Sequence, residues 1–162
     1  MSSVGLNHVS INAIDLEKSL QFYETLFGME RIATYNFGIR TQYLKYGSQQ
    51  LHIFVLPEGS PRYQHFALNV TDFHAVYDKA SEMGVLDGET FGNSINALPD
   101  GSVQMYLRDP GGNLVEVDWP DVTQLDRSRL PELKYLADRI PQTGENLEAT
   151  LYLDRREAAA RE

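Results

Sequence analysis

The sequence predicts an α+β domain built from two copies of one βαβββ module. The first observation is a repeated strand signature. Residues 8–15 (HVSINAID) and residues 65–72 (HFALNVTD) carry His, Asn and Asp at the same places. The second observation is that each copy runs into a segment with apolar residues at helical spacing, which ends on Gly28 or Gly84. A strand-then-helix unit used twice predicts two half-domains with a site between them.

The first module is expected at residues 4–57. Residues 6–12 alternate around His8 and predict a strand, and Asp15 is a good N-cap for the helix that follows. Three further strands are predicted at residues 30–37, 39–46 and 50–56, which are rich in β-prone residues. Pro57 and Pro61 then separate the two halves.

The second module, at residues 62–120, repeats this order. A strand at 63–70 leads to a helix that Asp72 caps, and weak extended segments at 85–91 and a loop at 93–100 follow. Strands at 103–107 and 114–119 flank residues 109–113 (DPGGN), a pattern typical of a tight structural turn. Together the modules make one domain, residues 1–120.

The repeat ends at Asp121, and residues 121–162 form a C-terminal extension that is expected to be helical in part. Apolar residues at 130, 133, 136 and 137 predict a helix over 129–140, and the charged, Ala-rich tail at 154–162 suggests a frayed one. Packing or dimerisation is the role we expect for this extension.

Composition excludes several classes of function. The chain has 162 residues, no cysteine, and no apolar run near the ~20 residues of a membrane span. No secretory signal stands at its start, so we expect a cytoplasmic protein. Its formal net charge of −9 disfavours nucleic acid and anionic membranes as partners.

Four residues that can bind metal stand in otherwise apolar strands. His52 and Glu116 each have apolar neighbours on both sides, and His8 and His65 each begin a strand whose alternate residues (Val9 and Ile11, Phe66 and Leu68) are apolar. Because side chains alternate across a strand, each should face away from the helices and into the concave side of a sheet. An unpaired charge there would be costly, and a divalent metal would satisfy it. Two histidines with one carboxylate are a recognised metal-binding set, suited to Fe(II) among others.

These residues and the motifs around them resemble the vicinal oxygen chelate superfamily. This superfamily includes glyoxalase I, fosfomycin and bleomycin resistance proteins, methylmalonyl-CoA epimerase and extradiol dioxygenases. Three motifs carry the resemblance, LNHVSINAIDLEKSLQFYETLFGM, QHFALNVTDF and YLRDPGGNLVEVDWP, over about residues 4–120. It implies a cupped mixed sheet around a metal site, a small-molecule substrate and a homodimer.

The resemblance also implies roles for single residues. His8, His65 and Glu116 match the metal ligands of the family, and His52 is either a fourth ligand or an acid–base residue. Tyr106 resembles the catalytic Tyr of the extradiol enzymes. Strand parity places Tyr106 and Gln104 towards the cavity, where Gln104 and Ser10 are expected to contact substrate.

Three functions therefore compete. An extradiol-type ring-cleaving dioxygenase is favoured, because His52 and Tyr106 complete a set that resembles those enzymes, and Fe(II) is then the favoured metal. A glyoxalase- or epimerase-type lyase or isomerase, working through a metal-bound enolate with Mn(II), Ni(II) or Zn(II), is the alternative. The third is a non-catalytic drug-binding resistance protein. A fosfomycin-type reaction ranks lower, because it needs Lys and Arg residues around a phosphonate and the candidates for this role are Arg40 and Arg108.

Overall fold

The first module folds into a four-stranded sheet with one helix. The structure is a computed structural model that describes residues 6–36, 38–58 and 60–152. Its sheet has the order β1-β4-β3-β2, with β1 parallel to β4 and the other neighbours antiparallel. The elements are β1 (His8–Ala13), α1 (Leu16–Phe27), β2 (Glu30–Ile32), β3 (Thr41–Tyr46) and β4 (Gln49–Val55).

The second module repeats this topology and adds one strand. Its order is β5-β8-β7-β6-β9, with β5 parallel to β8, so its first four strands match the first sheet. The predicted repeat of two βαβββ modules is therefore confirmed. The elements are β5 (His65–Asn69), α2 (Phe73–Met83), β6 (Ile95–Ala97), β7 (Val103–Arg108), β8 (Leu114–Trp119) and β9 (Leu133–Tyr135).

Local sequence signals fix both helices. The side chain of Asp15 accepts a hydrogen bond from the backbone N–H of Lys18, and Asp72 does the same for Ala75. Both helices end on a glycine in the left-handed region, with φ of 61° at Gly28 and 65° at Gly84. The capping predictions are confirmed in both modules.

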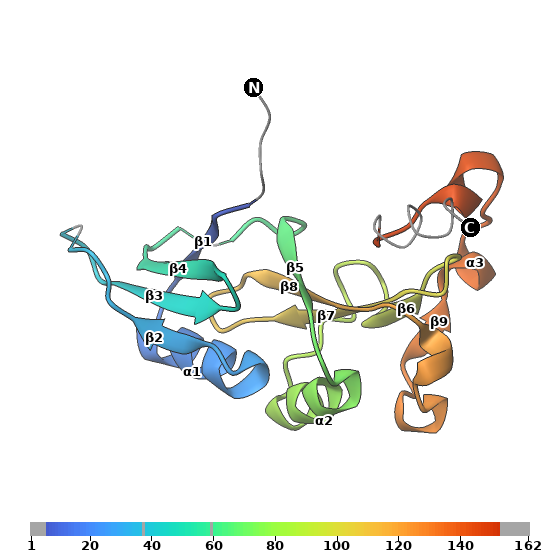
Figure 1. The fold of residues 1–162 in the computed structure, drawn as a ribbon, viewed down its shortest axis with the longest axis horizontal. Helices are drawn as coiled ribbons and strands as arrows, with labels where there is room; N and C mark the ends of the chain where they lie inside the picture. The colour runs from blue at the N-terminus through green and yellow to red at the C-terminus, as the bar shows by residue number, and fades with distance from the viewer. Residues whose placement is uncertain (1–5, 37, 59, 153–162) are drawn as a thin grey trace.

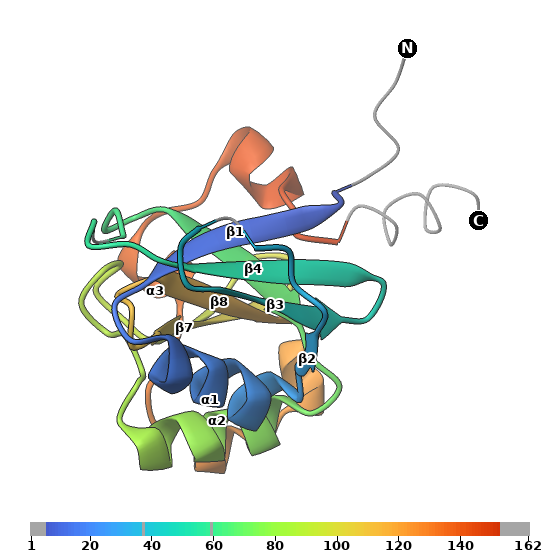
Figure 2. The same cartoon turned by 90° about the vertical axis from the view of Figure 1, so that its left-hand side faces the viewer.

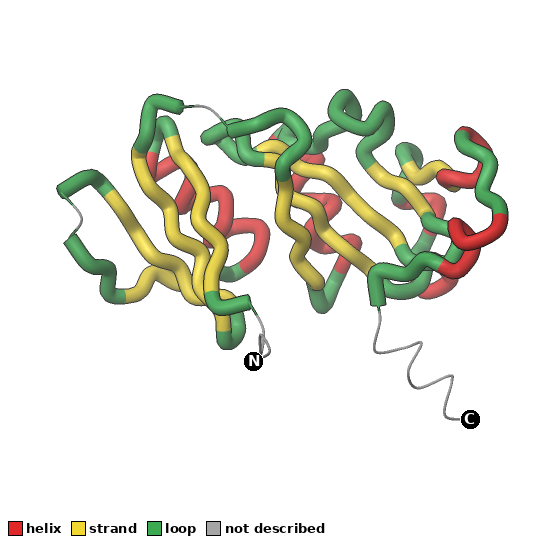
Figure 3. Tube along the Cα trace, turned by 90° about the horizontal axis from the view of Figure 1, so that it is seen from above, coloured by secondary structure: helices red, strands yellow, loops and turns green. Residues whose placement is uncertain are grey.

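The two sheets lie side by side with both helices on the same side of them (Figures 1 and 2). Seen from above, the strands of the two modules form two neighbouring groups (Figure 3). The apolar faces of the strands pack on the helices, where Leu20, Tyr23 and Phe73 are almost completely buried. No helix in the described ranges has the length and apolar character that crossing a membrane requires. The opposite face of each sheet is left for polar residues.

Two strand predictions were wrong in detail. The segment predicted as a strand at 30–37 is one only over Glu30–Ile32, and β3 begins at Thr41 instead of residue 39. The predicted loop at 93–100 contains β6, whose three residues are all buried. A three-residue strand carries too little pattern to be read from sequence, because its pairing partners determine it.

The C-terminal extension differs from its prediction. Only Leu136–Arg139 (α3) of the expected helix at 129–140 is α-helical, while Leu133–Tyr135 forms β9 in parallel with β6. Apolar residues at helical spacing were misleading, because Leu133 is buried in the sheet rather than on a helix face. The predicted helix at 154–162 lies outside the described residues. The described part of the extension, up to residue 152, also contains three short 3-10 helices: Val122–Gln124, Arg127–Arg129 and Gly144–Glu148.

Three contacts fasten the start of the extension to α2. Arg129 forms an ion pair with Asp78 at 2.5 Å, and the hydroxyl of Tyr77 donates to Glu132 at 2.7 Å. His74, which pattern alone places in solvent, accepts a hydrogen bond from the backbone N–H of Asp126 at 2.9 Å. The extension is therefore built onto the helix that backs the second sheet.

The turn at residues 109–113 joins the two modules. The buried carboxylate of Asp109 accepts hydrogen bonds from the hydroxyl of Tyr23 (2.8 Å) and the backbone N–H groups of Gly111 (2.9 Å) and Asn113 (2.7 Å). The Asn113 side chain donates to the backbone oxygen of Asn12 at 2.7 Å. A Cβ at Gly111 would lie 2.7 Å from that same oxygen, so only glycine fits. The turn is structural, as predicted, and it also holds the modules together.

Candidate metal centre

The strand register places the predicted site residues on the faces away from the helices. His52 stands opposite Ser10 on β1 and Tyr43 on β3. Glu116 stands opposite Tyr106 on β7 and Ala67 on β5. Directly opposed residues share one face of a sheet, whereas their chain neighbours, such as Val115 and Ile53, are buried in the core. The parity argument for these residues holds.

On the first sheet, three rings form a continuous stack. The ring of His52 lies 3.5 Å from that of Tyr43 and 4.2 Å from that of His8, nearly parallel to both. Burial, and then the neighbouring His8, lowers the pKa of His52, so its imidazole is held neutral. His52 is thus fixed between Tyr43 and the exposed His8.

On the second sheet, His65 and Glu116 form a close pair. Nε2 of His65 lies 3.2 Å from Oε2 of Glu116, and Gln104 donates from its side chain to Oε1 of Glu116 at 2.6 Å. Glu116 is buried, and its Oε2 has no hydrogen-bond partner among the described residues. Burial, and then the charge of Glu116, raises the pKa of Tyr106 well above its usual value. Tyr106 therefore stays a neutral hydroxyl beside the carboxylate.

The hydrogen bonds of the three histidines separate them into two kinds. Nδ1 of His65 lies 2.8 Å from the carbonyl oxygen of Tyr63, and Nδ1 of His8 lies 2.9 Å from the side-chain oxygen of Asn7. Because these oxygens only accept, Nδ1 carries a proton in both rings, and Nε2 is the nitrogen that can bind a metal. His52 instead directs Nε2 at Gln50 Oε1, at 2.9 Å. The repeat-matched histidines therefore offer the same nitrogen, and His52 does not.

Sequence reasoning missed Asp118, which lies two residues after Glu116 on the same face of β8. Asp118 is buried, stands opposite Gln104, and its Oδ1 has no hydrogen-bond partner in the described part of the chain. Burial, and then the nearby Glu116, raises the pKa of Asp118 to about 8. The signal was present in LVEVDW, since residues two apart in a strand share a face.

In the metal-free protein, we expect the free energy of unfolding to fall as pH rises from about 4 to about 8. Folded Asp118 keeps its proton up to a pKa of about 8, whereas an unfolded Asp loses it near 3.9. The stabilisation is complete below about pH 4 and is lost above about 8, with a slope of at most about 1.4 kcal/mol per pH unit. Urea unfolding with chelator across this range measures it. Asp118→Asn should flatten the slope, and an unchanged slope in that variant would contradict the assignment.

One chain does not bring the three predicted ligands together. Within the described ranges, no three His, Asp or Glu side chains are grouped so that they could hold a metal ion. His65 and Glu116 belong to the second sheet, whereas His8 stacks on His52 in the first. The expectation that His8 and His65 flank one site is therefore not met within a single chain.

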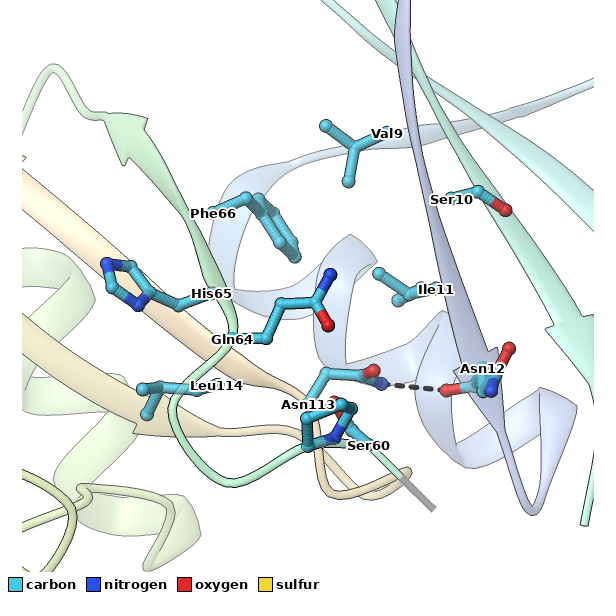
Figure 4. Close-up of a pocket in the computed structure, with 11 residues that line it drawn as sticks. Val9, Ser10, Ile11, Asn12, Ser60, Gln64, His65, Phe66, Asn113 and Leu114 are labelled. Carbon is cyan, nitrogen blue, oxygen red and sulfur yellow. Dashed lines mark hydrogen bonds between the residues drawn. The ribbon is translucent and has the colours of Figure 1, made fainter. Parts of the chain in front are cut away.

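The cavity between the modules is separate from the His65–Glu116 pair and from the His8–His52 stack. It has a volume of about 200 Å³ and lies between β1 and β5. In Figure 4, Phe66 and Gln64 point into this space, while the imidazole of His65 and the hydroxyl of Ser10 point away from it. Ser10 is exposed on the same face as His52, so it stays a candidate for substrate contact on that side.

The His65–Glu116 pair has the chemistry of half a metal site. Nε2 of His65 and the carboxylate oxygen of Glu116 lie 3.2 Å apart, so a proton on Nε2 or a metal cation bound to both atoms makes the contact favourable. Two ligands bound to one metal at about 2.0–2.2 Å lie about 3.0–3.4 Å apart. The pair therefore fits a divalent metal, and it leaves coordination positions for a third ligand and for substrate.

Comparison with known proteins places the chain in a family. The model of the Glyoxalase/Bleomycin resistance protein/Dioxygenase superfamily matches residues 5–117. This chain belongs to that superfamily. Metallothiol transferase FosB from Shouchella clausii is 30% identical over 127 residues, which are 70% of this chain and 78% of that protein. The predicted resemblance and the α+β fold class are confirmed.

Solved structures share the fold. The fosfomycin resistance protein FosX from Listeria monocytogenes superposes with a TM-score of 0.61 at 18% identity, over 76% of this chain and 97% of that one. Lactoylglutathione lyase from Agrobacterium tumefaciens superposes with a TM-score of 0.55 at 21% identity, over 73% of this chain and 95% of that one. The family match ends at residue 117, so the extension lies outside it.

Proposed function

We propose that this protein is a divalent-metal-dependent enzyme that binds a small substrate through two neighbouring oxygens. The observation that carries the proposal is the close approach of His65 Nε2 to Oε2 of buried Glu116, an oxygen that has no hydrogen-bond partner among the described residues. Family membership supports it, and FosX from L. monocytogenes has been crystallised with Mn(II) and sulfate. His and carboxylate donors suit Fe(II), Mn(II), Ni(II) and Zn(II).

We infer that the third ligand, His8, comes from a second copy of the chain. His8 offers the same nitrogen as His65 but stands on the other sheet. In a twofold dimer, the first sheet of one chain can face the second sheet of its partner, and two equivalent sites result. The homodimer that the family resemblance implies would then be required to complete each metal centre.

The bound metal would act as a Lewis acid that polarises the substrate oxygens. Gln104 and Tyr106 orient Glu116 towards it from the neighbouring strand. His52 is held by the ring stack with Nε2 on Gln50, so Nδ1 is the nitrogen left for accepting a proton from the substrate. Ser10 lies beside His52 and is placed for contact with substrate.

Redox-neutral chemistry is the reaction class we favour. A neutral His52 serves as a base for enolate-type lyase or isomerase reactions, and the relatives named above are a lyase, a metallothiol transferase and a fosfomycin resistance protein. Extradiol ring cleavage is the second candidate, because His52 and Tyr106 both face the proposed site. None of those relatives is named as a dioxygenase.

Metal binding is the direct test. Purified protein, stripped and titrated with Mn(II), Zn(II), Ni(II) or anaerobic Fe(II), should take up one metal per chain. Glu116→Gln should weaken binding by more than the roughly 10–100-fold that loss of an outer-shell partner costs. Glu82→Gln, on the exposed surface of α2, is the matched control and should bind normally. Wild-type protein that takes up none of these metals would refute the proposal.

Activity assays then separate the reaction classes. Metal-loaded protein is tested for lactoylglutathione formation, for fosfomycin consumption with and without a thiol, and for catechol-dependent O2 uptake. Turnover in the first two assays supports redox-neutral chemistry, whereas a yellow ring-fission product with O2 uptake supports the dioxygenase. Metal binding without turnover in any assay would favour a binding protein of the resistance type.

A further inference from the structure

A partly exposed aromatic wall stands beside the His65–Glu116 pair. The ring of Phe91 lies 4.8 Å from that of Tyr106 and 5.9 Å from those of His65 and Tyr63. Phe91 and Tyr63 are 38% and 59% exposed, although both are large and apolar. Ring surface on this scale is a favourable contact for a flat or apolar ligand. The wall is defined as Tyr63, Phe91 and the buried Tyr106. Tyr63 and Phe91 have no role in the proposed metal chemistry.

Positive charge from the C-terminal extension lies next to this wall. The guanidinium of Arg139 donates through Nη2 to the backbone oxygen of Phe91 and through Nη1 to the side-chain oxygen of Asn96, both at 3.2 Å. Arg139 is exposed, and these two bonds use only two of its five N–H donors. A planar fork of this kind suits bidentate recognition of an oxyanion.

Lys134 lies on the same side of the sheet. It stands opposite Asn96, which stands opposite Gln104, and directly paired residues share a face. Leu133, its neighbour in the chain, is buried on the other face. Two cations on one face are notable in a chain with a formal net charge of −9. Arg108, the cation foreseen from sequence, is instead engaged by Asp87 at 2.6 Å.

We propose that the wall and Arg139, with Lys134, form a subsite for an aromatic ligand that carries a carboxylate or phosphonate group. The inference rests on the proposed function, since it names the substrate class of that same site. Asn96 on β6 and Glu116 on β8 are separated by one strand, β7, so their backbones lie about 10 Å apart. That span accommodates one aromatic ring with an oxyanion at one end and metal-binding oxygens at the other. The C-terminal extension thus determines substrate specificity.

Direct binding of simple probes tests the subsite without turnover. Full-length protein is titrated with benzoate, phenylphosphonate and neutral benzamide, followed by NMR shifts and calorimetry. We expect both anions to bind more tightly than benzamide. Arg139→Gln should weaken the anions about tenfold and leave benzamide unchanged, because it removes a charge-assisted pair and no ring contact. Phe91→Ala should weaken all three probes.

Controls keep the outcomes distinct. Arg129→Gln changes another arginine of the extension, which pairs with Asp78 on α2, and should bind every probe normally. Lys134→Gln should weaken only the anions. Equal binding of benzoate and benzamide, or equal losses in Arg129→Gln and Arg139→Gln, would overturn the subsite. Repeating the titrations on Glu116→Gln without metal separates the hypotheses: anion binding that depends on Arg139 supports the subsite even if no metal is taken up.

Discussion

Mixing His8→Ala chains with Glu116→Gln chains should restore tight metal binding to about a quarter of the wild-type capacity. Each variant alone lacks one ligand in every site. In a mixed dimer, one site receives His8 from the Glu116→Gln chain and an intact His65–Glu116 pair from the other chain. Half of randomly assorted dimers are mixed, and each has one complete site of two. Co-refolded variants, measured by metal content after gel filtration, give the capacity.

The same experiment with His65→Ala and Glu116→Gln is the control. Both residues belong to the second sheet, where they lie 3.2 Å apart, so no combination of these chains completes a shared site from one module. Capacity should stay near zero. Equal restoration in both mixtures, or none in either, would show that the metal is not held between the first sheet of one chain and the second sheet of its partner.

Replacing Asp109 with Ala should lower the free energy of unfolding by about 3 kcal/mol or more. The change leaves the hydroxyl of Tyr23 and the backbone N–H groups of Gly111 and Asn113 without their acceptor, in a buried position. Each unsatisfied buried donor costs about 1–3 kcal/mol. Both modules should lose stability together, because this turn holds them to one another. Urea unfolding followed by far-UV circular dichroism measures the change.

Asp126→Ala is a matched comparison for that experiment. Its carboxylate also accepts from a backbone N–H, that of Ser128, but it is exposed at the start of a short 3-10 helix. We expect a loss of about 1 kcal/mol or less. A loss as large as that of Asp109→Ala would show that burial and the link between modules do not explain the role of Asp109.

Features set by neighbouring residues were readable from the sequence. Asp15 and Asp72 cap their helices through bonds three residues along the chain, and Gly28 and Gly84 supply a left-handed φ that other residues rarely adopt. Strand alternation placed Glu116 on the polar face for the same reason. The pair of βαβββ modules followed from these local signals, because each occurs twice in the same order.

Features that depend on residues far apart in the chain could not be predicted from the sequence. The separation of His8 from the His65–Glu116 pair depends on how the modules pack, which Tyr23 and Asn113 decide through contacts across the chain. β9 is a strand because β6 lies beside it, although Leu133 shares a helical spacing with Leu130 and Leu136 outside the strand. Arg139 reaches Asn96 through that same strand pairing, so no pattern in the extension pointed to the site.

β9 also covers backbone groups that would otherwise be open to other molecules. Without it, the three buried residues of β6 would end the second sheet with unpaired N–H and C=O groups. Such rows are templates for strand addition by another chain, which leads to aggregation. β2, the edge strand of the first sheet, has only three residues, and short edge strands resist this pairing. A chain that ends before Leu133 would therefore lose solubility, in addition to losing Lys134 and Arg139 of the proposed subsite.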